Sequence, residues 1–446
     1  MNAASLKTLQ DSTMFHMSLG SKELFHSNFL HWISIVKWNA FLNIMHGLAD
    51  VTTFWWEDKY SPYKNNLEVR REFHNFDLSI YILDSESEAT DGVTDDDSAD
   101  EIVGNKKQKW IPVLILENKM KSLPYKAQLD KYVEKAYKDY FVGNAKGSLI
   151  NNAKKGVNQV LNIDSNNCPI TFILLSLTTP SLSNYTYKYN ITGKRPKFSV
   201  TFDGEWKHKT YNNLISEIKS INVSPPSGLN HDLIDDYCRF VEALCHLADN
   251  DWKVDTSKNY IKTIWEGGVD ERKLRIHDIR EKIQYEQLLN FLEVELTKAK
   301  ISFKRFDTDD LKKTRTKGVL TNISFAHGIG LFEVQYIVDN TWRLIIQVQG
   351  NRYCHMIIND KKNITNKKNK KPIFGSLLSG YEKFIKNPNS ATDPSWPNNV
   401  RKPDYNKYGR YNYDNIYQWS EIPQGSLIAD VVNAMVADLN TTIKNF

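Results

Sequence analysis

The feature that most constrains the fold is the segment WIPVLILEN at residues 110–118, which is apolar at odd and even positions alike. Successive side chains of a strand point to opposite faces of a sheet, so this segment needs cover on both sides. It therefore predicts a central strand in a sheet flanked by helices. The segment runs into the polar residues Glu117, Asn118 and Lys119, which places charge at the end of a buried strand.

Helical and strand patterns alternate around this segment, which predicts an α/β domain with a mixed sheet. Apolar residues recur at helical spacing in some stretches, and β-branched and aromatic residues dominate others. The expected elements are a helix at 20–47, one or two strands at 67–83, a helix at 126–142, strands at 169–178 and 198–206, and helices at about 211–221 and 230–248.

A chain of 446 residues is long enough for two or three domains. We expect a first domain at 1–255 and a second, α+β domain at 256–446 with an antiparallel sheet. The elements expected in the second domain are a long helix from 273 to about 300, strands near 320–327, 331–338, 342–349 and 352–358, and a final helix at about 425–443.

The formal net charge of +5 hides an uneven distribution. Residues 84–101 carry nine acidic side chains and no Lys or Arg, so the rest of the chain is more basic than the total suggests. We expect 84–109 to be an acidic, disordered insertion in a hairpin. The excess of basic residues outside 84–101 favours polyanionic partners, above all nucleic acid.

No apolar stretch approaches the length of a membrane-spanning helix, so we expect no membrane partner. The first residues lack a basic segment followed by an apolar one, so they do not resemble a signal peptide. The expected location is therefore the cytoplasm.

Three charged residues could form a site at the end of the central strand. Glu117 and Lys119 are two apart on one strand and share a face, and Asp77 lies in the preceding strand region. If the two strands pair as a hairpin, two carboxylates and one ammonium group meet at one spot. Such an oxygen-rich site suits Mg²⁺ or Mn²⁺, which would activate a water molecule and neutralise phosphate charge.

The sequence resembles the PD-(D/E)xK superfamily of nucleases, which has the restriction-endonuclease-like fold, and in particular its bacterial branch with an ENK motif. Asp77 in NFDLSI and Glu117-Asn118-Lys119 in LILENKM match the motif positions. Gln128 and Tyr132 in QLDKY resemble the Gln-x-x-x-Tyr pattern of RecB-like members. Glu23 matches a glutamate on the first helix, and Phe76 replaces the motif's proline.

The resemblance covers about residues 20–250 and implies a metal-dependent nuclease. Asp77 and Glu117 would bind the metal, together with the backbone carbonyl of Asn118, and Glu23 is a further candidate ligand. Lys119 would position the water or stabilise the transition state. Gln128 would complete the catalytic group, and Tyr132 would touch the substrate. DNA is the expected substrate in preference to RNA, and a bacterial role in anti-phage defence or DNA processing is expected.

Several alternatives stay open. Glu117 and Lys119 could be a simple ion pair, and the protein an inactive nuclease fold that binds nucleic acid or assists assembly. The nuclease could also be gated by an effector that the second domain senses. A homo-oligomer or a partner subunit is compatible with all three readings.

Two basic stretches could contact nucleic acid. Residues 361–371 include Lys367, Lys368 and Lys370, and residues 401–417 interleave Arg401 and Arg410 with tyrosines. Cations contact phosphates, and aromatic rings stack on unpaired bases. The alternatives are a solvated lysine loop and a tyrosine-rich loop packed on the second domain.

Overall fold

The computed structural model divides the chain into two compact units, 1–247 and 248–446. The residues that the structure describes are 3–19, 22–58, 60, 65–84, 109–120, 124, 126–143, 160–163, 169–180, 183–194, 197–220, 229–306, 317–326, 329–339, 341–359 and 415–446. Apart from its ends, the expected acidic insertion lies outside these residues.

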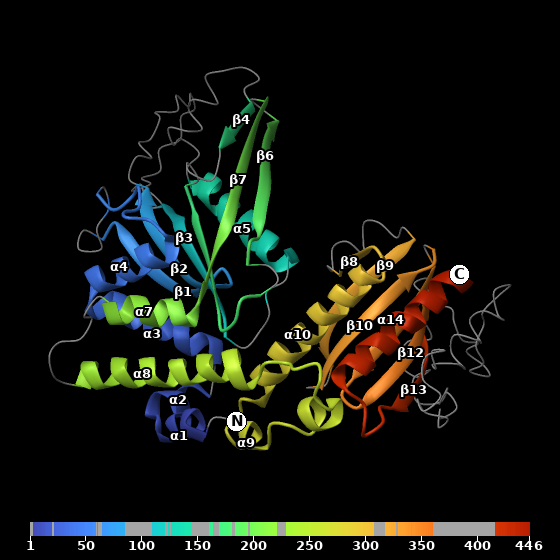
Figure 1. The fold of residues 1–446 in the computed structure, drawn as a ribbon. Coiled ribbons are helices and arrows are strands. Elements are labelled where there is room, and N and C mark those ends of the chain that lie inside the picture. Colours follow the sequence, from blue (N-terminus) through green and yellow to red (C-terminus); the bar gives the residue numbers. More distant parts are fainter. Residues whose placement is uncertain are drawn as a thin grey trace, which may run out of the picture. The chain divides into compact units, whose positions relative to one another are not determined.

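Unit 1 is built around a mixed sheet with strand order β1-β2-β3-β5-β7-β4, and β6 pairs with β7 (Figure 1). Neighbours are antiparallel from β1 to β3, and β3, β5 and β7 run parallel. The strands are β1 Leu67–Phe73, β2 Phe76–Asp84, β3 Lys109–Lys119, β4 Val160–Ile163, β5 Thr171–Ser176, β6 Thr186–Lys194 and β7 Lys197–Thr210.

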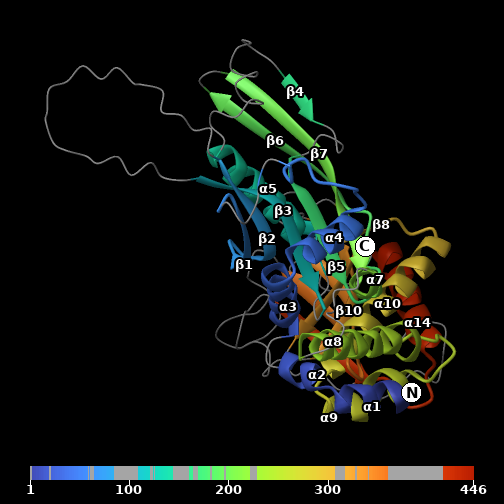
Figure 2. The same ribbon diagram turned by 90° about the vertical axis from the view of Figure 1, so that its left-hand side faces the viewer.

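Helices cover both faces of this sheet, as the apolar central segment predicts. The contacts of β3 show which helix lies on which face, because Glu117 bonds to α5 and its neighbour Asn118 bonds to α7. Helices α3 and α4 pack with α7 in the layer opposite α5 (Figures 1 and 2). The helices are α1 Ala3–Asp11, α2 Thr13–Ser18, α3 Lys22–Val36, α4 Trp38–Ala49, α5 Lys126–Gly143, α7 Tyr211–Ser220 and α8 Leu229–His246.

The single helix expected over 20–47 is wrong, because two helices, α3 and α4, occupy this region. Lys37 separates them with φ −149° and ψ 66°, outside the helical range. It follows a run that includes Ile33, Ile35 and Val36, and β-branched residues are weak helix formers. Apolar periodicity continues across such a break and does not reveal it.

Unit 2 has a six-stranded sheet in the order β13-β12-β11-β10-β9-β8. All pairs are antiparallel except β8 with β9, which run parallel, so the expectation of an antiparallel sheet holds for five of the six strands. The strands are β8 Phe303–Arg305, β9 Gly318–Ala326, β10 Ile329–Ile337, β11 Trp342–Gln349, β12 Arg352–Asn359 and β13 Asn415–Glu421.

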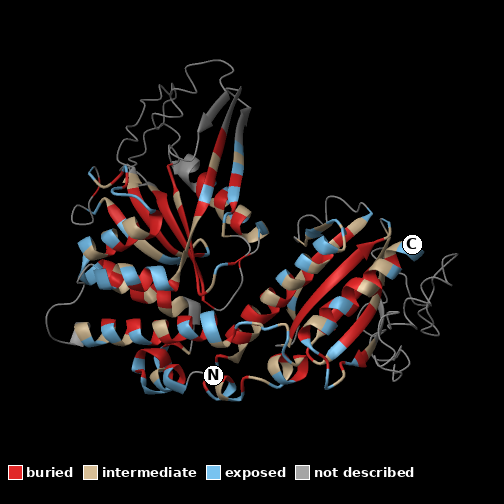
Figure 3. Ribbon diagram, viewed as in Figure 1, coloured by how far each residue is buried: buried red, intermediate tan, exposed pale blue. Residues whose placement is uncertain are grey.

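Two long helices, α10 and α14, pack on one face of this sheet with the short helix α9 nearby in sequence. Alternate residues of β10, among them Phe332 and Val334, enter the core, and β10 is buried along most of its length (Figure 3). α10 begins at His277, not at 273 as expected. The elements are η3 Leu247–Asp251 and η4 Ile261–Trp265, both π-helical, α9 Val269–Lys273, α10 His277–Lys298 and α14 Ile428–Asn445.

The division between the units falls after Leu247, earlier than the expected boundary at 255. Trp252 is fully buried, and its indole N–H donates to Glu271 at 3.1 Å. The amide of Val254 donates to Gln287 at 2.7 Å. These bonds tie the segment after Leu247 to α9 and α10.

No helix in the described ranges is both long and apolar enough to cross a membrane.

Burial of His26 on α3 should make unit 1 sensitive to acid. Its ring accepts or donates a hydrogen bond with the Tyr237 hydroxyl at 2.9 Å, and burial lowers the pKa of His26 from 6.5 to about 3. The unfolded chain takes up this proton below pH 6.5 and the folded chain does not. The unfolding free energy contributed by this residue is therefore intact above pH 6.5 and falls by up to about 1.4 kcal/mol per pH unit toward pH 3.

His26→Gln removes this titration, so its unfolding free energy should fall less steeply than that of the wild type. Urea denaturation between about pH 6 and pH 4 measures the difference. The control is His231→Gln, because the His231 side chain is 43% exposed. An unchanged slope in the His26 variant would contradict the prediction.

Candidate active site

The paired strands β2 and β3 bring Asp77 and Glu117 to facing positions. Leu78 pairs with Leu116 in the antiparallel register, so Asp77 and Glu117 come next along the two strands. Directly opposed residues of antiparallel strands point to the same face. The backbone N–H of Asn118 donates to the Asp77 carboxylate at 2.6 Å, which fixes this carboxylate against β3.

Glu117 and Lys119 form a buried ion pair at the end of β3. Lys119 Nζ lies 2.5 Å from Glu117 Oε1, and the two residues are 7% and 1% exposed. Burying either charge alone would be costly, so each requires the other. The pair also confirms the expectation that both side chains project to the same face of the strand.

Helix α5 places Gln128 and Tyr132 against this pair. The Gln128 amide donates to Glu117 at 3.2 Å and to the Tyr132 hydroxyl at 2.8 Å. Burial, followed by the negative charge of Glu117, raises the pKa of Tyr132 to about 12. Tyr132 is therefore a neutral phenol at physiological pH and keeps its O–H as a donor.

The five residues divide into a buried part and a partly exposed part. Glu117 and Lys119 are buried, and Asp77, Gln128 and Tyr132 are half-buried. Solvent reaches the cluster through Asp77, Gln128 and Tyr132. The ring of Tyr132 packs edge-on against the ring of Phe76, and the two ring centroids are 5.6 Å apart.

Asn118 points to the opposite face of β3, where the Tyr211 hydroxyl donates to its side-chain oxygen. Tyr211 begins α7 and lies against the ring of His26. This contact anchors the strand end from behind and leaves the other face to α5. The expected role of the Asn118 backbone carbonyl as a metal ligand stays a prediction.

Sequence reasoning missed two polar residues beside Lys119. Lys119 pairs with Ser176 in the parallel register of β3 and β5, and the Ser176 hydroxyl lies 2.7 Å from His208 Nε2. Burial, followed by Lys209, lowers the pKa of His208. Ser176 could have been found from the sequence, because it is the last residue of the buried strand TFILLS. The carboxyl ends of parallel strands meet at the same edge of a sheet, so Ser176 could have been placed near the end of β3. His208 had none, because its place depends on the register of β7.

Asp77 and Glu117 supply carboxylate oxygens, which are the ligands that hard divalent cations prefer. Within the described ranges, no group of three or more His, Cys, Asp or Glu side chains is placed to hold a metal ion. Mg²⁺ needs fewer, because it takes one or two carboxylates and completes its shell with water and substrate phosphates. An all-oxygen pair from Asp77 and Glu117 suits Mg²⁺ or Mn²⁺ better than softer metals.

Other residues expected in the site lie outside the part of the chain that the structure describes. These are the side chain of Glu23 and the basic residues Lys367, Lys368, Lys370, Arg401 and Arg410. The end of the 401–417 stretch, for which a tyrosine-rich loop was one of the two alternatives, belongs to strand β13, which pairs with β12.

Comparisons of this chain with family models, with curated proteins and with solved structures find no match.

Proposed function

We propose that unit 1 is a metal-dependent nuclease that hydrolyses phosphodiester bonds, with DNA as the preferred substrate. The observation that carries the proposal is the meeting of Asp77, Glu117 and Lys119 on one face of two paired strands. Gln128 and Tyr132 contact the same group from α5, as the resemblance to the PD-(D/E)xK superfamily implies. The mixed sheet between helices is compatible with the restriction-endonuclease-like fold of that superfamily.

Asp77 and Glu117 would hold Mg²⁺ or Mn²⁺. When bound, the ion lowers the pKa of a water molecule and neutralises phosphate charge. The oxygen of the attacking water forms a bond to phosphorus, the bond from phosphorus to one ester oxygen breaks, and that oxygen receives a proton. The side chains of this chain orient and stabilise the groups that take part.

Lys119 supplies a positive charge beside the reacting phosphate, and Glu117 holds its ammonium group in place. Gln128 fixes the Glu117 carboxylate by a hydrogen bond. The Tyr132 phenol, neutral because its pKa is about 12, can donate to a phosphate oxygen without repelling it. The formal net charge of the chain is +5, and a positive net charge favours a polyanionic substrate.

A second candidate function is nucleic-acid binding without cleavage. Glu117 is 1% exposed and already contacts both Lys119 and Gln128, which is also what a purely structural ion pair requires. The two functions differ in whether the charges are needed for chemistry or only for packing.

Cleavage should require Asp77 and Lys119. In Asp77→Asn and Lys119→Met, the rate of cutting supercoiled and linear DNA with Mg²⁺ or Mn²⁺ should fall at least about 100-fold, because metal binding or charge stabilisation is lost. Chelation of the metal should stop cutting by the wild type.

The matched control is Glu134→Gln, which removes a carboxylate from an exposed ion pair of α5 and should cut at the wild-type rate. Folding of each variant is checked by circular dichroism. DNA binding without any cleavage by the wild type would support the second candidate function instead.

A double-variant cycle separates chemistry from packing. Lys119→Met alone leaves the Glu117 carboxylate buried without its partner and should cost about 3 to 5 kcal/mol of unfolding free energy. Adding Glu117→Gln makes both groups neutral at similar size, so most of that stability should return. Urea denaturation measures the stability and plasmid cleavage the activity. The stable double variant should remain unable to cut; wild-type cutting by it would rule out the catalytic roles.

A further inference from the structure

Unit 2 contains a pocket of its own, of about 450 Å³, which the proposed nuclease reaction does not use. Its volume lies in the range of small-molecule sites. It is formed by η4, the turn after it, α9, the start of α10 and the first residue of β10. The lining residues are Ile264, Trp265, Glu266, Gly267, Arg272, His277, Arg280, Glu281 and Ile329.

Arg280 is a buried cation with few partners. It is 7% exposed, and its guanidinium donates to the carbonyl of Thr263. Among the described residues, its ion-pair partner is Glu271, whose Oε1 lies 3.8 Å from Arg280 Nε, which is longer than a hydrogen bond. Arginine has five N–H donors, so this side chain can still bind an anion in the pocket.

The backbone is shaped to bring this guanidinium to the pocket wall. A Cβ on Gly267 would lie 2.3 Å from Arg280 Nη2. At Gly268, where φ is +80°, a Cβ would lie 2.4 Å from Arg280 Nη1. At Gly267 a Cβ would also lie 2.5 Å from the backbone oxygen of Thr263, and at Gly268 the positive φ favours glycine. The turn is therefore fitted around the guanidinium.

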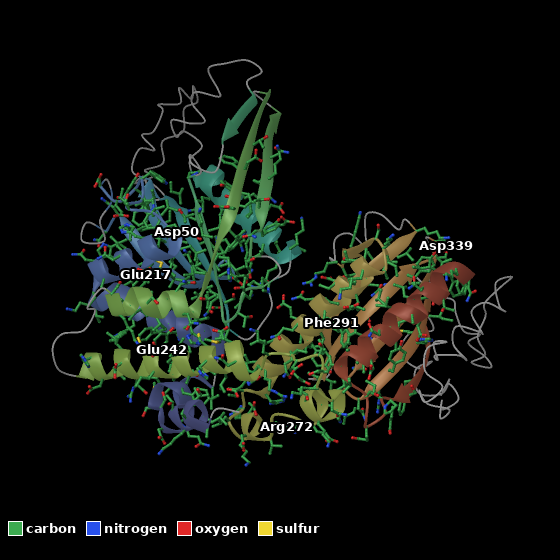
Figure 4. All side chains as sticks on the ribbon, in the orientation of Figure 1. Asp50, Glu217, Glu242, Arg272, Phe291 and Asp339 are labelled. Atoms are coloured by element: carbon green, nitrogen blue, oxygen red, sulfur yellow. The ribbon has the colours of Figure 1, made fainter. Side chains whose placement is uncertain are left out.

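Two further polar side chains, His277 and Arg272, line the pocket near Arg280. His277 is the first residue of α10, a helix of 22 residues, and its Nδ1 is buried with no hydrogen-bond partner among the described residues. The N-terminus of a helix attracts negative charge. Arg272 lies on α9 and is exposed (Figure 4). Its guanidinium donates to the carbonyls of Trp265 and Gly267 at 3.1 and 3.2 Å.

The remaining wall suits a planar ring with N–H groups. Trp265 is half-buried, and a Cβ on Gly350 would lie 2.7 Å from its ring, which fixes the indole. Ile264 and Ile329 add apolar surface. Glu281 is half-buried, its carboxyl already accepts a hydrogen bond from the backbone of Gly330, and burial raises the pKa of this carboxyl.

We propose that this pocket binds a nucleoside monophosphate. The phosphate contacts Arg280, Arg272 and the start of α10, and the base packs on Trp265 with its amino or imino groups toward Glu281. Inorganic phosphate would leave the indole and the carboxyl unused. A purely apolar ligand would leave the Arg280 guanidinium with the Thr263 carbonyl as its hydrogen-bond acceptor and His277 Nδ1 without a partner among the described residues. The two arginines disfavour a simple cation, although Glu266 and Glu281 also line the pocket.

Isothermal titration of the full chain tests this proposal. The probes are the four ribonucleoside 5′-monophosphates, their nucleosides and inorganic phosphate, in buffer without divalent metal. At least one monophosphate should bind with a micromolar dissociation constant, at least about ten-fold tighter than its nucleoside and than phosphate. The absence of binding by every monophosphate at millimolar concentration, or equal binding of the nucleoside, would overturn the proposal.

Variants assign the binding to this pocket. Arg272→Gln at the exposed rim should weaken binding about ten-fold without unfolding the protein, and Lys273→Gln, an exposed neighbour on α9 that does not line the pocket, should not. Arg280→Lys should also weaken binding, because lysine lacks the planar fork. Asp77→Asn in unit 1 should bind like the wild type, which keeps this result independent of nuclease activity. Unweakened binding in Arg272→Gln would overturn the assignment.

Discussion

The ion pair between Glu117 and Lys119 is the interaction on which the site in unit 1 depends. Two opposite charges at the end of a buried strand are stable only together, because each alone would have to give up its hydration without compensation. The pair in turn fixes the Glu117 carboxylate for the amide of Gln128, and Gln128 orients Tyr132. Loss of one charge would therefore disturb the whole polar face of β3 that looks toward α5.

Alternation along β3 lets one strand end serve two purposes. Glu117 and Lys119 face α5 and form the candidate site, and Asn118 between them faces α7 and bonds to Tyr211. The same Asn118 donates its backbone N–H to Asp77 on β2. The residue that anchors the strand from behind thus also sets the position of the second carboxylate. A central strand covered on both faces is what makes this coupling possible.

The part of the site that lies in one hairpin could be predicted from the sequence, since alternation and a simple antiparallel pairing bring Asp77, Glu117 and Lys119 together. Ser176 and His208 depend on the parallel register of three strands that are distant in the chain, which no local pattern contains. The parallel pairing of β8 was not foreseen because this strand has only three residues, too few to show an alternating pattern. The break at Lys37 was missed because an apolar face continues across it.

The two units treat a buried cation differently, and the contrast bears on function. Lys119 in unit 1 has a carboxylate at 2.5 Å, so its charge is compensated within the protein. Arg280 in unit 2 is equally buried, but its ion-pair partner among the described residues is 3.8 Å away and a carbonyl is its hydrogen-bond partner. Buried donors without partners destabilise a fold. A ligand anion in the adjoining pocket would supply the missing partners, so that unit 2 would gain stability on binding.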